Sequence, residues 1–128
     1  QMCCTAHWET DSAAPYKRAH KNHPSTVWTR QSIQHYRWLV KHGLEIRDEF
    51  EKRYGKVHAT KAVLQWLEQN EPNLPDNGFA EPPQCMPDQY KCEYDTVQAY
   101  RNYYHGEKPF AVWKYTQQPT WWKGYRYA

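Results

Sequence analysis

The chain has 128 residues, a formal net charge of +3 and a mean hydropathy of −1.14. This length suits a single domain that buries its own core without disulfide staples. No stretch approaches the roughly 20 apolar residues that a membrane-spanning helix needs, so we expect no membrane association. The adjacent Cys3 and Cys4 are a poor start for a secreted disulfide framework and favour a cytoplasmic location.

Charge and aromatic content are unevenly placed. Residues 1–60 hold ten basic and six acidic side chains, residues 61–100 hold two and seven, and residues 101–128 hold five and one. An acidic middle between two basic ends predicts separate polar faces. Seven Trp and eleven Tyr must supply core volume that Leu and Ile usually supply.

The first half of the chain predicts two helical stretches. Residues 1–8 read as the end of a helix that began upstream, and residues 9–24 read as a loop. Ser25 is a plausible cap for residues 26–54, which carry a mostly apolar stripe at steps of three or four. Within this long helix Gly43 is a candidate break, and Gly55 is a good stop.

The second half predicts two more helices and two irregular segments. Thr60 caps a helix over 60–69, and Asp95 caps another that ends at Gly106. Between them, residues 70–93 contain five prolines and form a long ordered loop, which Phe79, Met86 and Tyr90 pin to the body. Pro109 opens a short turn of helix through Trp113, and the last ten residues have no helical period. We therefore predict an all-α, compact helical domain over 1–128, with a long Pro-rich loop and an irregular aromatic C-terminal tail.

The segment YKRAHKNHP contains the first candidate site. His20 and His23 are spaced to share a metal or a phosphate, and the basic neighbours Lys17, Arg18 and Lys21 would repel a cation and attract an anion. The anion interpretation is therefore preferred. The alternative is that these are loop histidines bonded to the backbone.

Two arginines form a second candidate. Arg30 and Arg37 are seven residues apart on one predicted helix face and have no acidic residue within one turn, so a phosphate role is open to both. Glu49 and Arg53 differ, since their i,i+4 spacing is typical of a solvated ion pair.

The C-terminal block forms a third candidate. Here Lys123 and Arg126 are interleaved with aromatic residues that include Trp121 and Trp122. Cations follow a phosphate backbone while aromatic faces stack on unpaired bases. The alternative is that the rings close the core, which we expect for Trp113 and for at least one of the two adjacent tryptophans.

Metal and cofactor chemistry have weaker support. Cys3, Cys4 and His7 are weak candidates for a zinc site with Cys85 and Cys92, but neither cysteine pair has the C-x-x-C spacing. Buried free cysteine is commonly a small hydrophobe. No serine-nucleophile elbow, phosphate-cradling Gly loop or HExxH motif is present. We expect no cofactor, and the residues themselves identify no catalytic group.

Several stretches together resemble an uncharacterised family of phage and bacterial proteins. They cover nearly the whole chain: CTAH (4–7), YKRAHKNHPSTVWTRQS (16–32), HYRWL (35–39), RYGKVH (53–58), MPDQYK (86–91), AYRNYYHGEK (99–108) and PTWW (119–122). Members of that family continue upstream with a helix carrying Asp-Lys-His and, seven residues after the His, a Glu. That helix is similar to the start of the phage pyrimidine-dimer DNA glycosylases. The tail of those enzymes also contains a block like Pro119, Thr120, Trp121, Trp122 and Lys123.

The resemblance implies an all-helical protein that binds DNA, in a bacterial host cell or associated with a virion. Its relatives flip a nucleotide and attack the damaged sugar with an N-terminal amine helped by a Glu. Those groups have no counterpart among these 128 residues, and Gln1 cannot be taken as the nucleophile. The resemblance therefore implies a DNA-repair-like, DNA-facing body, with glycosylase or lyase chemistry only if the upstream residues are present.

Two other classes of function stay open. The Pro-rich loop and the aromatic tail also suit a structural subunit of a phage virion or larger assembly, with protein partners. A metal-binding enzyme that uses the Cys and His residues is the third possibility.

Overall fold

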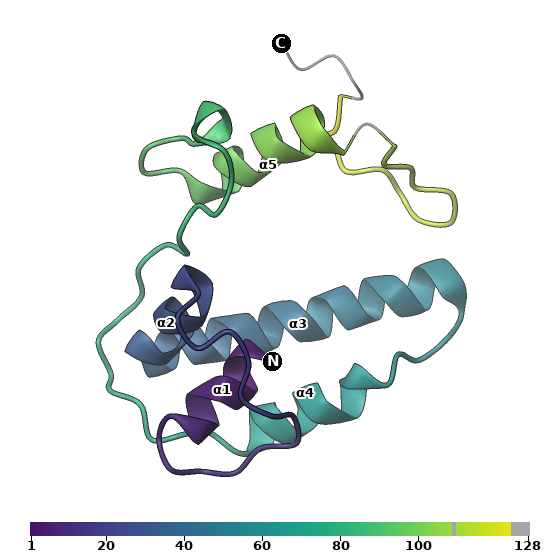
Figure 1. The fold of residues 1–128 in the computed structure, drawn as a ribbon. Helices are drawn as coiled ribbons and strands as arrows, with labels where there is room; N and C mark the ends of the chain where they lie inside the picture. The colour runs from purple at the N-terminus through teal and green to yellow at the C-terminus, as the bar shows by residue number, and fades with distance from the viewer. Residues whose placement is uncertain (109, 124–128) are drawn as a thin grey trace. The chain divides into compact units, whose positions relative to one another are not determined.

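The computed structural model describes residues 1–108 and 110–123, and this part of the chain is helical without any strand. The all-α prediction is confirmed. None of its helices is long and apolar enough to cross a membrane. The elements are α1 (Met2–Trp8), α2 (Pro24–Gln31), α3 (Ile33–Tyr54), α4 (Thr60–Gln69), the short 3-10 helix η1 (Asp88–Tyr90) and α5 (Thr96–Glu107) (Figure 1).

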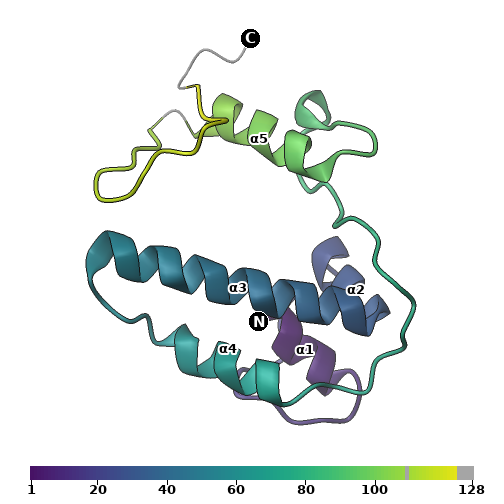
Figure 2. The ribbon, with the colours of Figure 1, turned by 180° about the vertical axis from the view of Figure 1, so that it is seen from behind.

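The chain forms two compact units, Gln1–Ala80 and Glu81–Ala128. In the first, α3 packs along α4, and α1 packs against α2 and α3 (Figure 2). Its core is one cluster of mostly aliphatic and small side chains around the ring of Tyr36: Cys3, Cys4, Ala6, Ile33, Tyr36, Val40 and Leu67.

A buried polar chain crosses this core. His7, which is 1% exposed, contacts the Ser12 hydroxyl through Nδ1 at 3.0 Å and the Tyr36 hydroxyl through Nε2 at 3.1 Å. The Tyr36 hydroxyl donates to the Leu67 carbonyl at 2.7 Å. Since that proton is committed to a carbonyl, His7 donates from Nε2 and accepts from Ser12 at Nδ1. Burial lowers the pKa of His7 below its ordinary value, which keeps the ring neutral.

The long helical pattern breaks at Ser32, and the prediction of a break at Gly43 is wrong. Ser32 has an extended backbone, with φ −155° and ψ 144°, and its side chain accepts from the Gln34 amide. A strap of residues 75–80 crosses the break, where Ile33 N donates to the Pro75 carbonyl at 2.8 Å and Ser32 Oγ donates to the Gly78 carbonyl at 2.7 Å. The strap thus replaces the hydrogen bonds that a continuous helix would have made.

Gly43 lies inside α3 for a packing reason. A Cβ at this position would stand 2.8 Å from Leu64 Cδ2, so the absent side chain lets α4 approach α3. The apolar stripe also becomes less buried toward the end of the helix, since Ile46 is 47% exposed and Tyr54 is 58% exposed. The stripe predicted the helix but overestimated the length of its buried face.

Helix ends confirm some predicted signals and correct others. Gly55 ends α3 in the left-handed conformation, and Asp95 caps α5, as predicted. His23, not Ser25, caps α2, because its Nδ1 accepts from Ser25 N at 3.1 Å. At the start of α4, Thr60 N donates to His58 Nδ1 at 3.1 Å, and Thr60 is the first residue of the helix rather than its cap.

In the second unit, α5 packs against η1. Tyr90 is buried, and its ring lies so close to Gly106 that a Cβ there would fall 2.4 Å from it. The close Tyr90 ring explains why position 106 is a glycine. The helix continues through Gly106 to Glu107, so the prediction that this glycine ends it is wrong. The predicted turn of helix after position 109 falls partly outside the described residues, and residues 111–113 are not helical.

The Pro-rich loop contributes to both units. Phe79 packs its ring against Trp28 at 5.9 Å in the first unit, and Tyr90 anchors the later part of the loop in the second. Two of the three side chains predicted to anchor the loop, Phe79 and Tyr90, therefore make ring contacts. Met86 is half-buried.

Candidate nucleic-acid interface

The basic segment between α1 and α2 forms a loop fixed by its backbone. We call residues 15–23 the cationic loop. The buried Thr5 hydroxyl donates to the Ala19 carbonyl and accepts from the Ala19 amide, both at 3.0 Å. Trp8 Nε1 donates to the Tyr16 carbonyl at 2.7 Å. Two side chains of α1 therefore hold the middle of the loop in place.

The charges of the loop are only partly neutralised. Glu9 pairs with Arg18 at 2.8 Å and with Lys21 at 3.7 Å. Arg30 reaches back from α2 to donate to the Lys21 carbonyl at 2.8 Å. Lys17 is exposed, and within residues 1–108 and 110–123 it has no ion-pair partner. One carboxylate thus serves two cations, and the loop keeps a positive excess.

The predicted histidine pair lies at the end of this loop. Both His20 and His23 are exposed, and the His23 amide donates to the His20 carbonyl at 3.0 Å. His20 has φ +48°, which turns the chain sharply into α2. Since His23 Nδ1 caps the helix, only its Nε2 remains for a ligand. The alternative that these histidines bond to the backbone therefore holds for Nδ1 of His23, and the rings of both His20 and His23 stay exposed.

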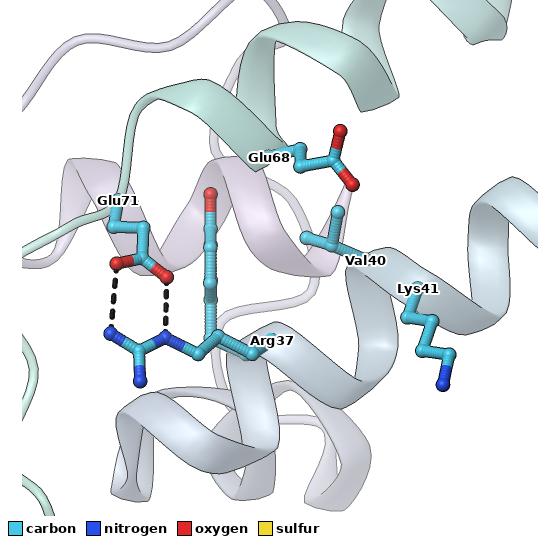
Figure 3. A pocket seen from close by; sticks show the side chains of 6 residues that line it. Arg37, Val40, Lys41, Glu68 and Glu71 are labelled. Atoms are coloured by element: carbon cyan, nitrogen blue, oxygen red, sulfur yellow. Dashed lines mark hydrogen bonds and ion pairs between the residues drawn. The ribbon is translucent and has the colours of Figure 1, made fainter.

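Arg37 has an acidic partner that the sequence did not indicate. Its Nε and one terminal nitrogen donate to the two carboxylate oxygens of Glu71 at 2.6 and 3.0 Å (Figure 3). This bidentate contact lowers the pKa of Glu71 and raises the pKa of Arg37. Arg37 has no acidic partner within one turn of its helix, as the sequence indicated, but Glu71, which lies 34 residues away beyond α4, occupies two of its nitrogens.

A pocket of about 210 Å³ lies beside this ion pair and is lined by Tyr36, Arg37, Val40, Lys41, Glu68 and Glu71 (Figure 3). Its wall carries two cations and two carboxylates, so it offers no net charge to an anion. The geometry favours a structural role for Arg37 in joining α3 to the segment after α4.

The predicted C-terminal site is largely used in packing. Trp122 is 7% exposed and stacks on His105 with ring centroids 4.9 Å apart and an interplanar angle of 4°. Lys123 N donates to His105 Nε2 at 3.0 Å. Trp113 packs on Trp122 at 5.5 Å and is half-buried, so of the rings expected to close the core Trp122 is the buried one.

The remaining residues of that site differ from Trp122. Trp121 is half-buried, with the Arg101 guanidinium 5.4 Å from its ring centroid. The Lys123 side chain is exposed. Arg126 lies outside the described residues. Of Trp121, Trp122 and Lys123, therefore, Trp121 and Lys123 present surface to a partner.

The weak zinc candidates lie in the first unit as core residues. Cys3 and Cys4 are buried, and burial raises the pKa of the Cys3 thiol to about 12. Both ring nitrogens of His7 are hydrogen-bonded. In the part of the chain that the structure describes, no three His, Cys, Asp or Glu side chains gather closely enough to hold a metal ion. A metal ligand needs an ionised thiol or a free imidazole nitrogen, and burial of Cys3 and the two hydrogen bonds of His7 work against both.

An aromatic cluster at the junction of α2 and α3 was not predicted. It consists of Trp28, His35, Trp38, His42 and Phe79, with Trp38 40% and Phe79 51% exposed. The i,i+4 spacing of Trp38 and His42 is a visible signal for their stacking, at 5.1 Å and 12°. The sequence predicted that Phe79 packs on the body of the protein but did not identify Trp28 and His35 as its partners.

Comparisons with protein-family models, curated proteins and solved structures found no match. Any functional conclusion therefore depends on the residues themselves and on the resemblance described above.

Proposed function

We propose that this protein binds nucleic acid through the cationic loop, contacting phosphates with Lys17, His20, Lys21 and His23 at the start of α2. The observation that carries the proposal is a backbone-anchored loop that exposes several cations for one pairing carboxylate, Glu9. The positive end of the α2 dipole lies beside the loop and adds to the attraction for an anion, although Pro24 has no N–H and the Ser25 amide is taken by His23.

A phosphate chain fits this loop better than a metal ion or a small neutral molecule. Cations this dense repel a metal ion, residues 15–23 contain no Asp or Glu, and the half-buried Glu9 outside the loop is paired with Arg18 and Lys21. Phosphate contacts from Lys and His side chains position a backbone without reading sequence. We therefore expect modest sequence preference and strong dependence on salt.

The resemblance to DNA glycosylases is the support for placing this binding in DNA repair. Within the proposal the described residues hold the DNA. The amine, His and Glu of the resembling enzymes have no counterpart among the 128 residues, so no catalytic group is assigned here.

The test compares two double variants of equal charge change. Binding of labelled single- and double-stranded DNA is measured by anisotropy across a salt series for the wild type, Lys17→Ala/Lys21→Ala and the control Lys52→Ala/Lys56→Ala. The control lysines are exposed and lie at the far end of α3 and just beyond it. We expect the loop variant to reduce the salt slope by about 2 and the control to leave it nearly unchanged. A wild-type affinity that ignores salt, or equal losses in both variants, refutes the proposal.

One observation favours a second candidate, a subunit that binds other proteins. The second unit exposes large apolar side chains, with Tyr94 88%, Val112 74%, Phe110 70% and Tyr115 65% exposed. Exposed apolar groups of this kind are typical of protein contacts when they are contiguous. Light scattering on the isolated chain tests self-assembly. A monomer at every concentration counts against it, whereas an oligomer that Val112→Glu dissociates supports it.

A further inference from the structure

His35 holds the end of the strap by a hydrogen bond that only a neutral ring makes. The ring is 4% exposed, in the first turn of α3. Its Nδ1 lies 2.7 Å from the Trp28 carbonyl oxygen, and its Nε2 accepts from the Ala80 amide at 2.9 Å. The two ring nitrogens therefore bridge α2 and the last residue of the strap.

These two partners define the protonation state of the ring. A carbonyl only accepts, so Nδ1 carries the hydrogen, and a backbone amide only donates, so Nε2 is bare. A second proton on Nε2 would point at the Ala80 N–H. The contact is therefore lost when the ring becomes charged, and the Ala80 amide must find water instead.

The ring itself is held independently of the strap. It stacks on Trp28 with centroids 4.1 Å apart and an interplanar angle of 7°. A cation is attracted to an indole face, so this stack persists after protonation. Trp28 Nε1 in turn donates to the Ala80 carbonyl at 3.0 Å. Ala80 is thus hydrogen-bonded through its amide to His35 and through its carbonyl to Trp28. Only the hydrogen bond to His35 depends on the protonation of a side chain.

Two rings contact His35, those of Trp28 and Phe79, and neither side chain is ionisable. Four ionisable groups on α2, α3 and the strap have other partners. His42 stacks on Trp38, Asp76 of the strap bonds to Gln34, Arg30 of α2 bonds to the Lys21 carbonyl, and Arg37 of α3 bonds to Glu71. None of these groups stands in for the lost contact at Ala80.

We propose that His35 is a pH-sensitive latch, whose protonation releases Ala80 and loosens the end of the strap over Trp28. The earlier part of the strap stays in place. Its contacts are Ile33 N to the Pro75 carbonyl, Ser32 Oγ to the Gly78 carbonyl, and Asn77 N to Ser32 Oγ at 3.2 Å, and none involves an imidazole. The release is therefore local to residues 79–80.

Nuclear magnetic resonance on the whole chain tests the latch. Between pH 8 and pH 5 we follow the imidazole nitrogens of His35 and the hydrogen exchange of two amides, Ala80 and Ile33, corrected for the intrinsic pH dependence. We expect the Nδ1–H tautomer at pH 8. As His35 protonates, protection of Ala80 should fall about tenfold with the same midpoint, while protection of Ile33 stays. An Nε2–H tautomer at pH 8, or Ala80 protection that ignores His35, overturns the proposal.

Two variants assign the effect to one side chain. His35→Gln keeps an acceptor near the position of Nε2 and does not titrate, so Ala80 protection should become independent of pH. His42→Gln changes an exposed histidine of the same aromatic cluster and should leave the response intact. If His42→Gln abolishes the response, His42 is the sensor and the proposal is wrong. If His35→Gln does not fold, the tautomer and the shared midpoint in the wild type still decide.

Discussion

The two units of this protein use different materials for their cores. Residues 1–80 bury aliphatic side chains, two cysteines and a few rings such as Tyr36 between four helices, and a polar chain through His7 and Tyr36 crosses that core. In the described part of the second unit, residues 81–108 and 110–123, α5 is the one α-helix, and rings do most of the packing, with Trp122 on His105 and Tyr90 on Tyr103. Several helices can bury aliphatic side chains and rings between them, whereas a unit built on one α-helix depends mainly on large rings to bury enough surface.

The largest effect is expected in the aromatic unit. Trp122→Ala removes the ring that stacks on His105 and packs on Trp113. Truncating a buried Trp costs about 3–5 kcal/mol. We expect loss of hydrogen-exchange protection along α5, measured amide by amide. Full protection of α5 in the variant would show that the packing of these rings does not stabilise the second unit. Trp38→Ala, at a ring 40% exposed in the first unit, is the matched control and should cost much less.

The next effect tests the polar chain of the first unit. Tyr36→Phe keeps the ring and removes a hydroxyl that contacts His7 and donates to the Leu67 carbonyl. Leaving buried partners unsatisfied costs about 1–3 kcal/mol, measured as the free energy of unfolding in urea. Tyr54→Phe, at a side chain 58% exposed, serves as the control and should be near neutral. Equal losses in the two variants would contradict the role of the buried chain.

The glycines give a paired test of close packing in the two units. Gly106→Ala places a Cβ 2.4 Å from the Tyr90 ring, and overpacking of this kind costs about 1–3 kcal/mol. Gly43→Ala meets only the flexible end of Leu64 at 2.8 Å, and alanine favours a helix over glycine by about 1 kcal/mol. We therefore expect Gly106→Ala to destabilise clearly and Gly43→Ala to be nearly neutral in thermal unfolding. The reverse order would refute this explanation of the two glycines.

The smallest effect is the pH dependence that His7 confers on the first unit. Burial lowers its pKa below the ordinary value of 6.5, so folding favours the neutral ring. The stability it contributes is present above pH 6.5 and is lost as the pH falls below that value. Urea unfolding at pH 7.5 and pH 5.5 should show this loss, and His7→Gln should reduce it. A wild-type stability that rises as the pH falls through this range would contradict the assignment.

The sequence by itself determined the helical class, most helix bounds and two of the helix signals, Gly55 and Asp95. These depend on local spacing and on backbone conformations that neighbouring residues decide. It also located the anchored cationic loop, because the charges that define it lie within nine residues.

Only the tertiary structure decided what crosses between distant segments. The partner of Arg37 comes from beyond α4, the break at Ser32 depends on a strap more than forty residues later, and Gly106 is explained by Tyr90 of η1. The histidines show the same division. The sequence places His20 and His23 in a polar loop beside a helix start, where both are exposed. Which nitrogen of the buried His35 carries no hydrogen follows only from its contact with the Ala80 amide. A local pattern cannot contain such a contact, because chain folding alone brings the two groups together.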